Sequence, residues 1–374
     1  MRPFCTLLAA AGLLGCGTTL ETVKTNPPQT TTHVYNGTAS VGDFLTITVD
    51  TSALTINYAD VSNGESGTVS YTVNGDGSYA INDPSGNLIA AYEVPNYALV
   101  IEAAKTGPMK NTPSLITAVE SGPITVATFA NQSFNYMQFR TTSGGMEIGS
   151  IAIGASSGQT TSYWPYGAFT VGADPAFGGG TQDFSSVVED PSGTFMTQTS
   201  PASQGGGTDT IFGTASGFFI VDTPNGSILG LPKAASMAFD PSTAGTYNAI
   251  FYKKINATTD ANNAETGTVI MNQATMTVTA SGTVTLTDGS GNNLLPAGST
   301  LTPVGAASYL YGGAGLLQDP CWGLFTVRAT TATTQQDIFF TFQGNAVLFS
   351  SFKANSLAAQ QNSTYNYYYG VGLK

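Results

Sequence analysis

Apolar and polar residues alternate with a period of two over much of the chain that follows His33. The clearest examples are Phe44–Val49 (FLTITV) and Thr68–Val73 (TVSYTV), each bounded by Gly, Asn or Asp. Because successive side chains of a strand point to opposite faces, this pattern predicts half-buried β-strands. Between Thr68–Val73 and Ser78–Ile81, the residues Asn74–Gly77 (NGDG) predict a tight hairpin, since Asn-Gly and Asp-Gly tolerate the positive φ that such turns need.

The same pattern recurs through to the C-terminal region, and no window of about 12 residues carries a helical stripe. Strands separated by turn signals every 8 to 12 residues or so are typical of sandwiches and barrels rather than of alternating α/β folds. The sequence therefore predicts an all-β protein built from antiparallel meander strands. The further predicted strands are Leu88–Val94, Tyr97–Glu102, Phe134–Arg140, Met146–Ile153, Gly217–Val221, Tyr247–Lys253, Ala274–Thr279, Thr283–Thr287, Leu324–Ala329, Asp337–Phe342 and Ala346–Phe352.

A weak internal repeat is visible where strands begin: an aromatic residue followed by Asn, at Tyr35-Asn36, Phe134-Asn135, Tyr247-Asn248 and Tyr365-Asn366. The first three pairs are about 100 residues apart, which predicts two or three barrel-like or sandwich-like units. The expected units are residues 33–131, 132–245 and 246–374, the last with a C-terminal strand that closes back on an earlier edge. Chance similarity among short Thr-rich and Tyr-rich strands is the alternative, because the period drifts.

The segment before these strands has a different composition. Residues 17–32 (GTTLETVKTNPPQTTT) show no apolar periodicity and contain Pro27-Pro28. Such a composition is typical of a flexible linker, so we expect residues 16–32 to form a tether. Fully extended, the tether would reach on the order of 50 Å.

A short apolar run precedes the tether. The run Phe4–Leu14 follows Arg2 and carries no charge. It is long enough for a signal peptide and too short to span a bilayer. It ends in Leu13-Leu14-Gly15-Cys16, and this junction resembles the lipobox of bacterial lipoproteins. An ordinary signal peptide with an incidental cysteine is the alternative.

The resemblance implies a lipid anchor. In that family the signal, here residues 1–15, is removed, and the cysteine, here Cys16, receives a diacylglycerol and usually a further acyl chain. More than one chain is what stable anchoring requires, so the membrane is an expected partner. Gly17 replaces the aspartate of an inner-membrane retention signal, so we expect the outer membrane, with its periplasmic or surface face left open.

Composition narrows the classes of function. Only 9% of residues are charged, compared with about 25% in ordinary soluble proteins, and the formal net charge is −12. Nucleic acid is excluded as a partner, because its phosphates demand clustered Lys and Arg. With 41% hydrophobic residues, the chain can bury enough apolar surface to fold.

The supply of catalytic and metal-binding side chains is equally limited. The one histidine, His33, lies at the end of the tether, where we expect a solvated linker residue. A Ser-His-Asp triad and a His-ligated or Cys-ligated zinc site are therefore excluded, and no cofactor is expected. Asp288–Asn293 and Asn74–Ser78 space oxygen side chains as calcium loops do, but both lack the distal Glu, so turns are expected. Cys321 is expected to be a small buried hydrophobe.

Aromatic and acidic residues leave two functions open. Tyr163, Trp164, Tyr166 and Trp322 are the candidate contacts for a glycan or a small apolar ligand, with core packing as the alternative. A carbohydrate-active enzyme would need two carboxylates near such a platform, and the candidates are Asp174, Asp183, Glu189 and Asp190. Asp190-Pro-Ser-Gly is also a turn sequence, which is the reading we favour.

The sequence as a whole favours a non-enzymatic protein: a membrane-anchored envelope lipoprotein whose β-rich body acts in binding, adhesion or structure. The alternative is a carbohydrate-active enzyme or a small-ligand carrier that uses the carboxylates and aromatics near residues 163–190.

Overall fold

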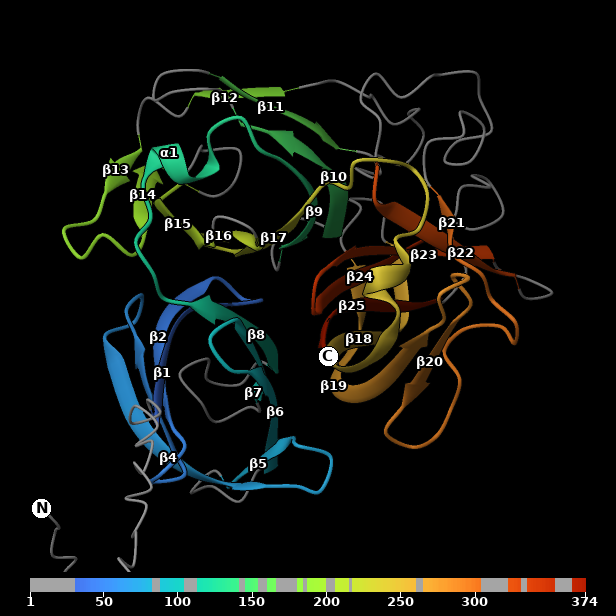
Figure 1. The fold of residues 1–374 in the computed structure, drawn as a ribbon, viewed down its shortest axis with the longest axis horizontal. Coiled ribbons are helices and arrows are strands. Elements are labelled where there is room, and N and C mark those ends of the chain that lie inside the picture. Colours follow the sequence, from blue (N-terminus) through green and yellow to red (C-terminus); the bar gives the residue numbers. More distant parts are fainter. Residues whose placement is uncertain are drawn as a thin grey trace, which may run out of the picture. The chain divides into compact units, whose positions relative to one another are not determined.

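The computed structural model describes residues 31–82, 88–103, 113–140, 145–153, 160–165, 180–183, 187–199, 206–214, 217–259, 265–303, 322–330, 335–353 and 365–374. Regular structure in these residues is β apart from one short helix, α1 (Val126–Phe129), and a 3-10 turn at Pro241–Thr243 (Figure 1). The predicted all-β fold class is confirmed.

The first sheet is a closed barrel of eight antiparallel strands in sequence order. Strand β8 pairs back with β1, where Tyr35 lies opposite Glu120, so this sheet has no free edge. The predicted hairpin at Asn74–Gly77 joins β4 to β5 and is confirmed. The strands are β1 (Thr32–Ala39), β2 (Asp43–Asp50), β3 (Thr55–Asp60), β4 (Glu65–Val73), β5 (Tyr79–Asn82), β6 (Leu88–Val94), β7 (Ala98–Ala103) and β8 (Ser114–Glu120).

The second sheet has nine strands in the order β12-β11-β10-β9-β17-β16-β15-β14-β13. Its first strand, β9, pairs with β10 on one side and with the last strand, β17, on the other. The strands are β9 (Ser133–Arg140), β10 (Gly145–Ala152), β11 (Thr160–Pro165), β12 (Gly180–Asp183), β13 (Val188–Glu189), β14 (Met196–Thr199), β15 (Thr208–Gly213), β16 (Phe219–Thr223) and β17 (Gly226–Pro232).

The third sheet has eight strands in the order β20-β19-β18-β25-β24-β23-β22-β21. Its C-terminal strand β25 lies between β24 and β18, so the end of the chain pairs with the strand that opened the sheet. The strands are β18 (Gly245–Thr259), β19 (Glu265–Val278), β20 (Val284–Asp288), β21 (Thr302–Pro303), β22 (Leu324–Thr330), β23 (Gln335–Gln343), β24 (Ala346–Lys353) and β25 (Tyr365–Leu373).

Each sheet is made from one consecutive stretch of chain, and residues 32–374 form a single compact unit. Whether the three stretches are true repeats and separate folding domains stays a prediction.

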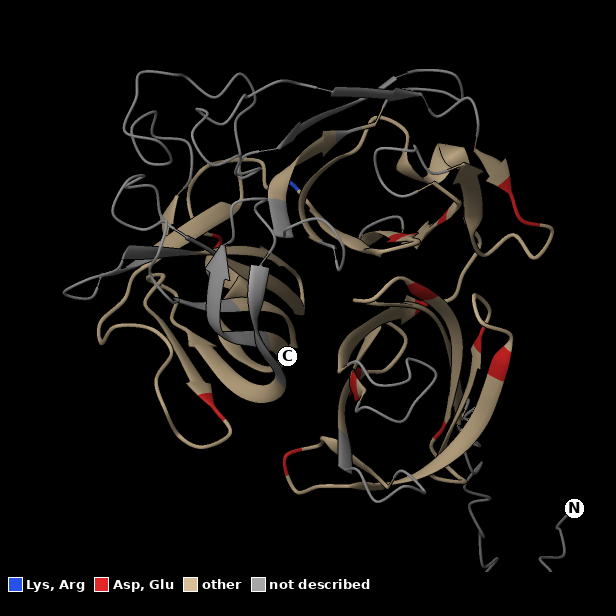
Figure 2. Ribbon diagram, turned by 180° about the vertical axis from the view of Figure 1, so that it is seen from behind, with Lys and Arg blue, Asp and Glu red and all other residues tan. Residues whose placement is uncertain are grey.

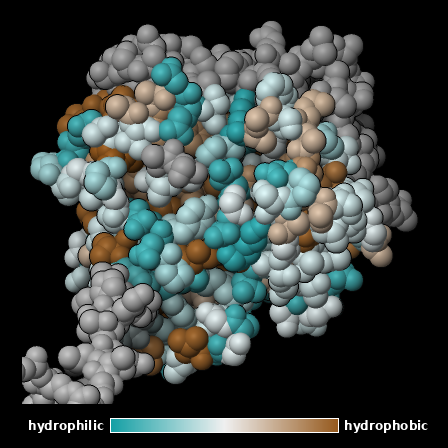
Figure 3. All heavy atoms as spheres, viewed as in Figure 1, coloured by the Kyte–Doolittle hydropathy of each residue, from teal (hydrophilic) through white to brown (hydrophobic). Residues whose placement is uncertain are grey.

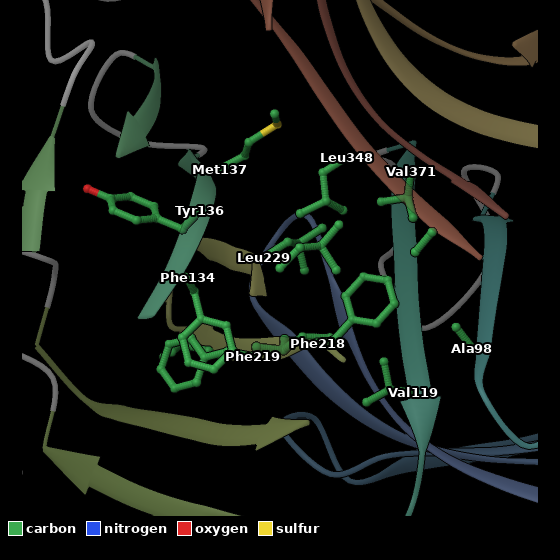
Figure 4. Packing of buried hydrophobic residues seen from close by; sticks show 14 of the residues in the cluster. Ala98, Val119, Phe134, Tyr136, Met137, Phe218, Phe219, Leu229, Leu348 and Val371 are labelled. Carbon is green, nitrogen blue, oxygen red and sulfur yellow. The ribbon is translucent and has the colours of Figure 1, made fainter. Parts of the chain in front are cut away.

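Three clusters of buried side chains form the core. One fills the barrel lumen with residues that include Leu45, Ile47 and Leu99. A second is rich in Phe and lies within the third sheet, where Gly370 of β25 packs directly under the ring of Phe349. The largest draws on strands of all three sheets, and Figure 4 shows part of it around Phe134, Phe218 and Phe219.

The described surface is polar with little charge. Acidic residues lie at separate positions on the strands and turns, and basic residues are few (Figure 2). On the face shown in Figure 3, hydrophilic and neutral residues cover most of the described surface, and hydrophobic residues form separate groups. This agrees with the low charged fraction of the sequence, 9%.

Candidate functional site

The densest set of hydrogen bonds to one buried charged side chain lies inside the barrel, around Glu93 of β6. The Glu93 side chain is 1% exposed. Its Oε1 atom lies 2.8 Å from His33 Nδ1 and accepts a hydrogen bond from Tyr35 Oη at 2.5 Å. Its Oε2 atom accepts a hydrogen bond from Tyr79 Oη. We call Glu93, His33, Tyr35, Tyr79 and the neighbouring Tyr71 the Glu93 cluster.

Strand geometry explains why these residues meet. The period of two places His33 and Tyr35 of β1 on the inner face of the barrel, and it does the same for Tyr79 and Glu93. Glu93 lies in β6, which in the closed ring of eight strands is three strands away from β1 in one direction and five in the other. The bonds from β1 to Glu93 therefore cross the lumen. The ring of Tyr71 stacks on Tyr79 with centroids 4.3 Å apart, which completes the layer.

The cluster lies near one end of the barrel. In an antiparallel meander, the starts of odd strands and the ends of even strands meet at the same end. That end carries Thr32 at the start of β1 and the turns at residues 51–54, 74–78 and 95–97. We call it the proximal end, because residues 1–31 lead into it along the chain. The opposite end carries the turn at residues 61–64.

The prediction for His33 is wrong. His33 belongs to β1 and is 9% exposed, so it is not a solvated linker residue. Its partner, Glu93, lies 60 positions away in the sequence, which is why no local motif revealed the pair. A signal was available in Leu88–Val94 (LIAAYEV), where a single charge stands in an apolar strand at an inward position.

Burial keeps the phenols of the cluster protonated. Desolvation, followed by the hydrogen bond to Glu93, raises the pKa of Tyr35 and of Tyr79 well above the usual range of tyrosine. Desolvation followed by the negative charge of Glu93 also raises the pKa of Tyr71. The two bonded tyrosines therefore act as donors and Glu93 as an acceptor whose oxygens are occupied. This arrangement suits cross-linking of the barrel wall more than proton transfer to a substrate.

Glycoside hydrolysis requires two carboxyl groups, about 5–9.5 Å apart. Among the described residues, the Glu93 cluster contains one. Side chains of the lumen core pack beside it, with Tyr35, Leu45 and Leu99 each at most 1% exposed. Eight-stranded barrels are just wide enough to be filled in this way or to hold one small ligand.

A second buried carboxylate links the barrel to the second sheet. Thr38 Oγ1 of β1 donates to Asp222 Oδ1 of β16 at 2.5 Å. Burial raises the pKa of Asp222 well above its usual value, opposed by the bond from Thr38 and reinforced by the charges of Asp43, Asp209 and Asp60. Ionisation of Asp222 should therefore lower the stability of the fold as pH rises, and thermal melts at several pH values can measure this change.

The candidate ligand contacts are divided between two sheets. Tyr163 and Trp164 lie in β11, opposite Ile151 and Ser150 of β10, but their side chains lie outside the described residues, as does Tyr166. Trp322 precedes β22 and is 39% exposed.

The backbone carbonyl of Trp322 connects the second and third sheets. The Trp322 oxygen accepts from Asn135 Nδ2 at 2.9 Å and from Ala234 N at 3.2 Å. Of the four candidate ligand contacts, Trp322 is the one whose side chain lies within the described residues, and this side chain is exposed. The lipid-attachment residue Cys16 and Cys321 lie outside the described residues.

The candidate carboxylates are placed in turns or at an edge. Asp190 closes the predicted turn by accepting from Ser192 N at 2.8 Å through its side chain and from Gly193 N at 2.8 Å through its carbonyl. Glu189 lies exposed in β13 and accepts from Val126 N at 3.2 Å. Asp174 and the side chain of Asp183 lie outside the described residues.

The calcium-like loop is also a turn. Asp288 Oδ1 accepts from the backbone amides of Ser290 and Asn292 at 3.0 and 2.9 Å. Within the described ranges, no group of three or more His, Cys, Asp or Glu side chains is arranged to hold a metal ion. None of the described helices has the length and apolar character needed to cross a bilayer.

Comparison with known proteins gives little further guidance. No protein-family model and no curated protein matches the chain. Among solved structures, transferrin binding protein B from Haemophilus parasuis Hp5, as a double mutant, is 8% identical, with 92% of this chain and 76% of that chain covered and a TM-score of 0.26.

The isotype 1 transferrin binding protein B from serogroup B Neisseria meningitidis is 11% identical, with 89% and 65% covered and a TM-score of 0.22. The DNA polymerase III subunit beta from Pseudomonas aeruginosa is 9% identical, with 93% and 94% covered and a TM-score of 0.13. Scores this low establish neither a common fold nor a common function.

Proposed function

We propose that this chain is a lipid-anchored protein of the bacterial outer membrane whose β-rich body serves as a binding, adhesion or structural module. The observation that carries the proposal is the junction Leu13-Leu14-Gly15-Cys16, followed by a Thr-rich and Pro-containing segment that leads into β1. Two or more acyl chains on Cys16 would hold the body on the membrane.

The described residues support a binding module more than an enzyme. Glu93, a buried carboxylate, already accepts from Tyr35 and Tyr79 and lies 2.8 Å from His33 Nδ1. Asp190 and Asp288 hold their own turns. A polar surface with few charges fits a partner of low charge, such as a glycan, and Tyr163, Trp164, Tyr166 and Trp322 stay predicted ligand contacts.

Metabolic labelling with an alkyne fatty acid tests the anchor. Cells that express the wild-type chain should yield a labelled protein in the membrane fraction, and Cys16→Ala should abolish the label. Cys5→Ala and Cys321→Ala are the matched controls, since each removes a different cysteine and should leave the label unchanged. An unlabelled wild type, or equal labelling of Cys16→Ala, would show that the lipobox interpretation is wrong.

A glycan array and a panel of small apolar ligands test the binding role. Residues 32–374 form a compact unit, so the full chain and this body should bind the same ligand. Trp322→Ala should weaken that binding more than Met237→Ala, since both side chains are exposed, at 39% and 43%, and only Trp322 is a candidate contact. Equal binding by both variants would remove Trp322 from the site.

A further inference from the structure

Three exposed aliphatic side chains lie at the proximal end of the barrel. Val34 is 46% exposed, Leu54 41% and Val73 56%. Val34 is near the start of β1, Leu54 is the last residue of the turn before β3, and Val73 ends β4, so all three lie at the end where residues 1–31 join the body. The fourth large exposed aliphatic residue of the described barrel, Val61, is 55% exposed and lies at the opposite end. We call Val34, Leu54 and Val73 the proximal rim.

Leu54 is held in place at a conformational cost. Its φ is +52°, a left-handed conformation that is strained for a residue other than glycine. Tyr71 N donates to the Leu54 carbonyl at 3.0 Å. Asp50 Oδ1 accepts from the amides of Ser52 and Ala53, each at 2.9 Å. The turn thus presents a large apolar side chain to solvent in a fixed position, where Gly or Asn would be less strained.

The charge at the proximal end limits the kinds of surface that this end can contact. The described proximal residues include the acidic Asp50, Asp76 and Glu120, and the proximal turns 51–54, 74–78 and 95–97 contain no Lys or Arg. Hydrogen bonds from Ala53 and Ser52 lower the pKa of Asp50, and those from Ser78 lower the pKa of Asp76, so both are ionised at neutral pH. An anionic surface would be repelled, whereas a zwitterionic lipid surface can accept the apolar rim without this cost.

Few residues separate the proximal rim from the proposed anchor. Cys16 and Thr32 are 16 residues apart in the sequence. Fully extended, a chain of that length reaches on the order of 50 Å. An anchor at Cys16 would confine the body within this reach of the membrane, and the raised effective concentration favours even a weak contact. The proximal end is the part of the body that the fewest residues separate from Cys16.

We propose that the proximal rim, formed by Val34, Leu54 and Val73, is a membrane-contact surface that seats the barrel end-on against zwitterionic lipid. This inference rests on the proposed anchor at Cys16. The rim side chains enter the interfacial layer, and the acidic residues beside them remain in water.

The test supplies the anchor artificially, so its outcome does not depend on lipidation in the cell. The full chain carrying Cys5→Ala and Cys321→Ala is coupled through the Cys16 thiol to maleimide lipid in phosphatidylcholine vesicles. Hydrogen exchange is then followed by mass spectrometry. Amides of residues 51–54 and 73–77 should exchange roughly 5–10-fold more slowly than in the uncoupled protein, as expected if the rim is seated about 80–90% of the time. The turn at 61–64 should not change.

Matched variants make the outcome specific. The triple variant Val34→Thr, Leu54→Asn, Val73→Thr should lose the protection, and Val61→Thr should keep it. A thermal melt of the triple variant excludes unfolding as the cause: its Tm should be no lower than that of the parent, because all three side chains are exposed and Asn relieves the strain at position 54. Adding about 50 mol% phosphatidylglycerol should reduce the protection through repulsion of the acidic residues.

Three results would overturn the proposal. One is an equal change in exchange rate at the two ends of the barrel when the protein is coupled to vesicles. Another is protection of residues 51–54 that the triple variant retains. The third is the same protection in concentrated protein without vesicles, which would assign the rim to a second copy of the chain. Failure of fatty-acid labelling in cells would count against the anchor alone.

Discussion

Removal of the Tyr79 hydroxyl should destabilise the barrel by the free energy of one hydrogen bond in the Glu93 cluster. Tyr79→Phe deletes one of the three described bonds to the Glu93 side chain and leaves His33 and Tyr35 in place. A hydrogen bond to a charged group contributes about 1.5–3 kcal/mol. Tyr79 is 8% exposed, so solvent screening is small and the full range applies. The free energy of opening of β1 and β5 should fall by that amount.

Hydrogen exchange measures this opening directly. A loss of about 1.5–3 kcal/mol corresponds to exchange that is roughly 10–150-fold faster for the core amides of β1 and β5. Glu93→Gln should cost more than Tyr79→Phe, because every bond to this side chain loses a charged acceptor and one acceptor oxygen becomes a donor amide, which leaves a buried donor without an acceptor. Tyr97→Phe is the matched control, since it removes only a 3.3 Å bond to the Gln343 carbonyl.

A double-mutant cycle decides whether the cluster acts as one unit. Tyr79→Phe and Glu93→Gln should be coupled by more than about 0.5 kcal/mol, the limit within which independent sites add. The reasoning is refuted if Tyr79→Phe changes exchange no more than Tyr97→Phe does, or if the two cluster substitutions are additive.

Two further substitutions test other parts of the fold. Burial raises the pKa of Asp222, so its contribution to stability is fully present below the pKa of the unfolded chain and is lost as pH rises through the folded pKa. Asp222→Asn keeps an acceptor for Thr38 and cannot ionise, so its advantage in Tm over the wild type should grow as pH rises above about 4, the usual pKa of Asp in an unfolded chain; a constant difference would contradict this. Gly370→Ala would place a Cβ atom 2.3 Å from Phe349 Cζ, whereas the Gly75 Cβ position has nothing within 4 Å. Urea unfolding should show Gly370→Ala less stable by about 1–3 kcal/mol and Gly75→Ala nearly unchanged, and equal effects would mean that β25 is packed less tightly than described.

The alternation of apolar and polar residues predicted strands where one face is buried and the other exposed. Phe44–Val49 became the centre of β2, whose outward positions are partly exposed. The pattern missed β8 (SLITAVE), because six of its seven residues are buried and an apolar run without alternation does not show a strand period. It also missed β14, which has only four residues.

The Glu93 cluster could not be predicted from local sequence. Its bonds join β1 and β5 to Glu93 of β6 inside a closed barrel, and closure depends on the pairing of β8 with β1. His33 stood next to a tether sequence, and only the register of β1 shows that it points inward with Tyr35. The exposed position of Trp322 follows from its place between sheets, which no periodicity encodes.

The mass of the mature N-terminus tests the proposed anchor most directly. The full chain would be expressed in a bacterium, extracted from membranes with detergent, digested and analysed by mass spectrometry. The account predicts an N-terminal peptide that begins at Cys16 and carries a diacylglycerol, with no peptide from residues 1–15. A peptide that spans residues 15 and 16, or an unmodified Cys16 at the N-terminus, would contradict it.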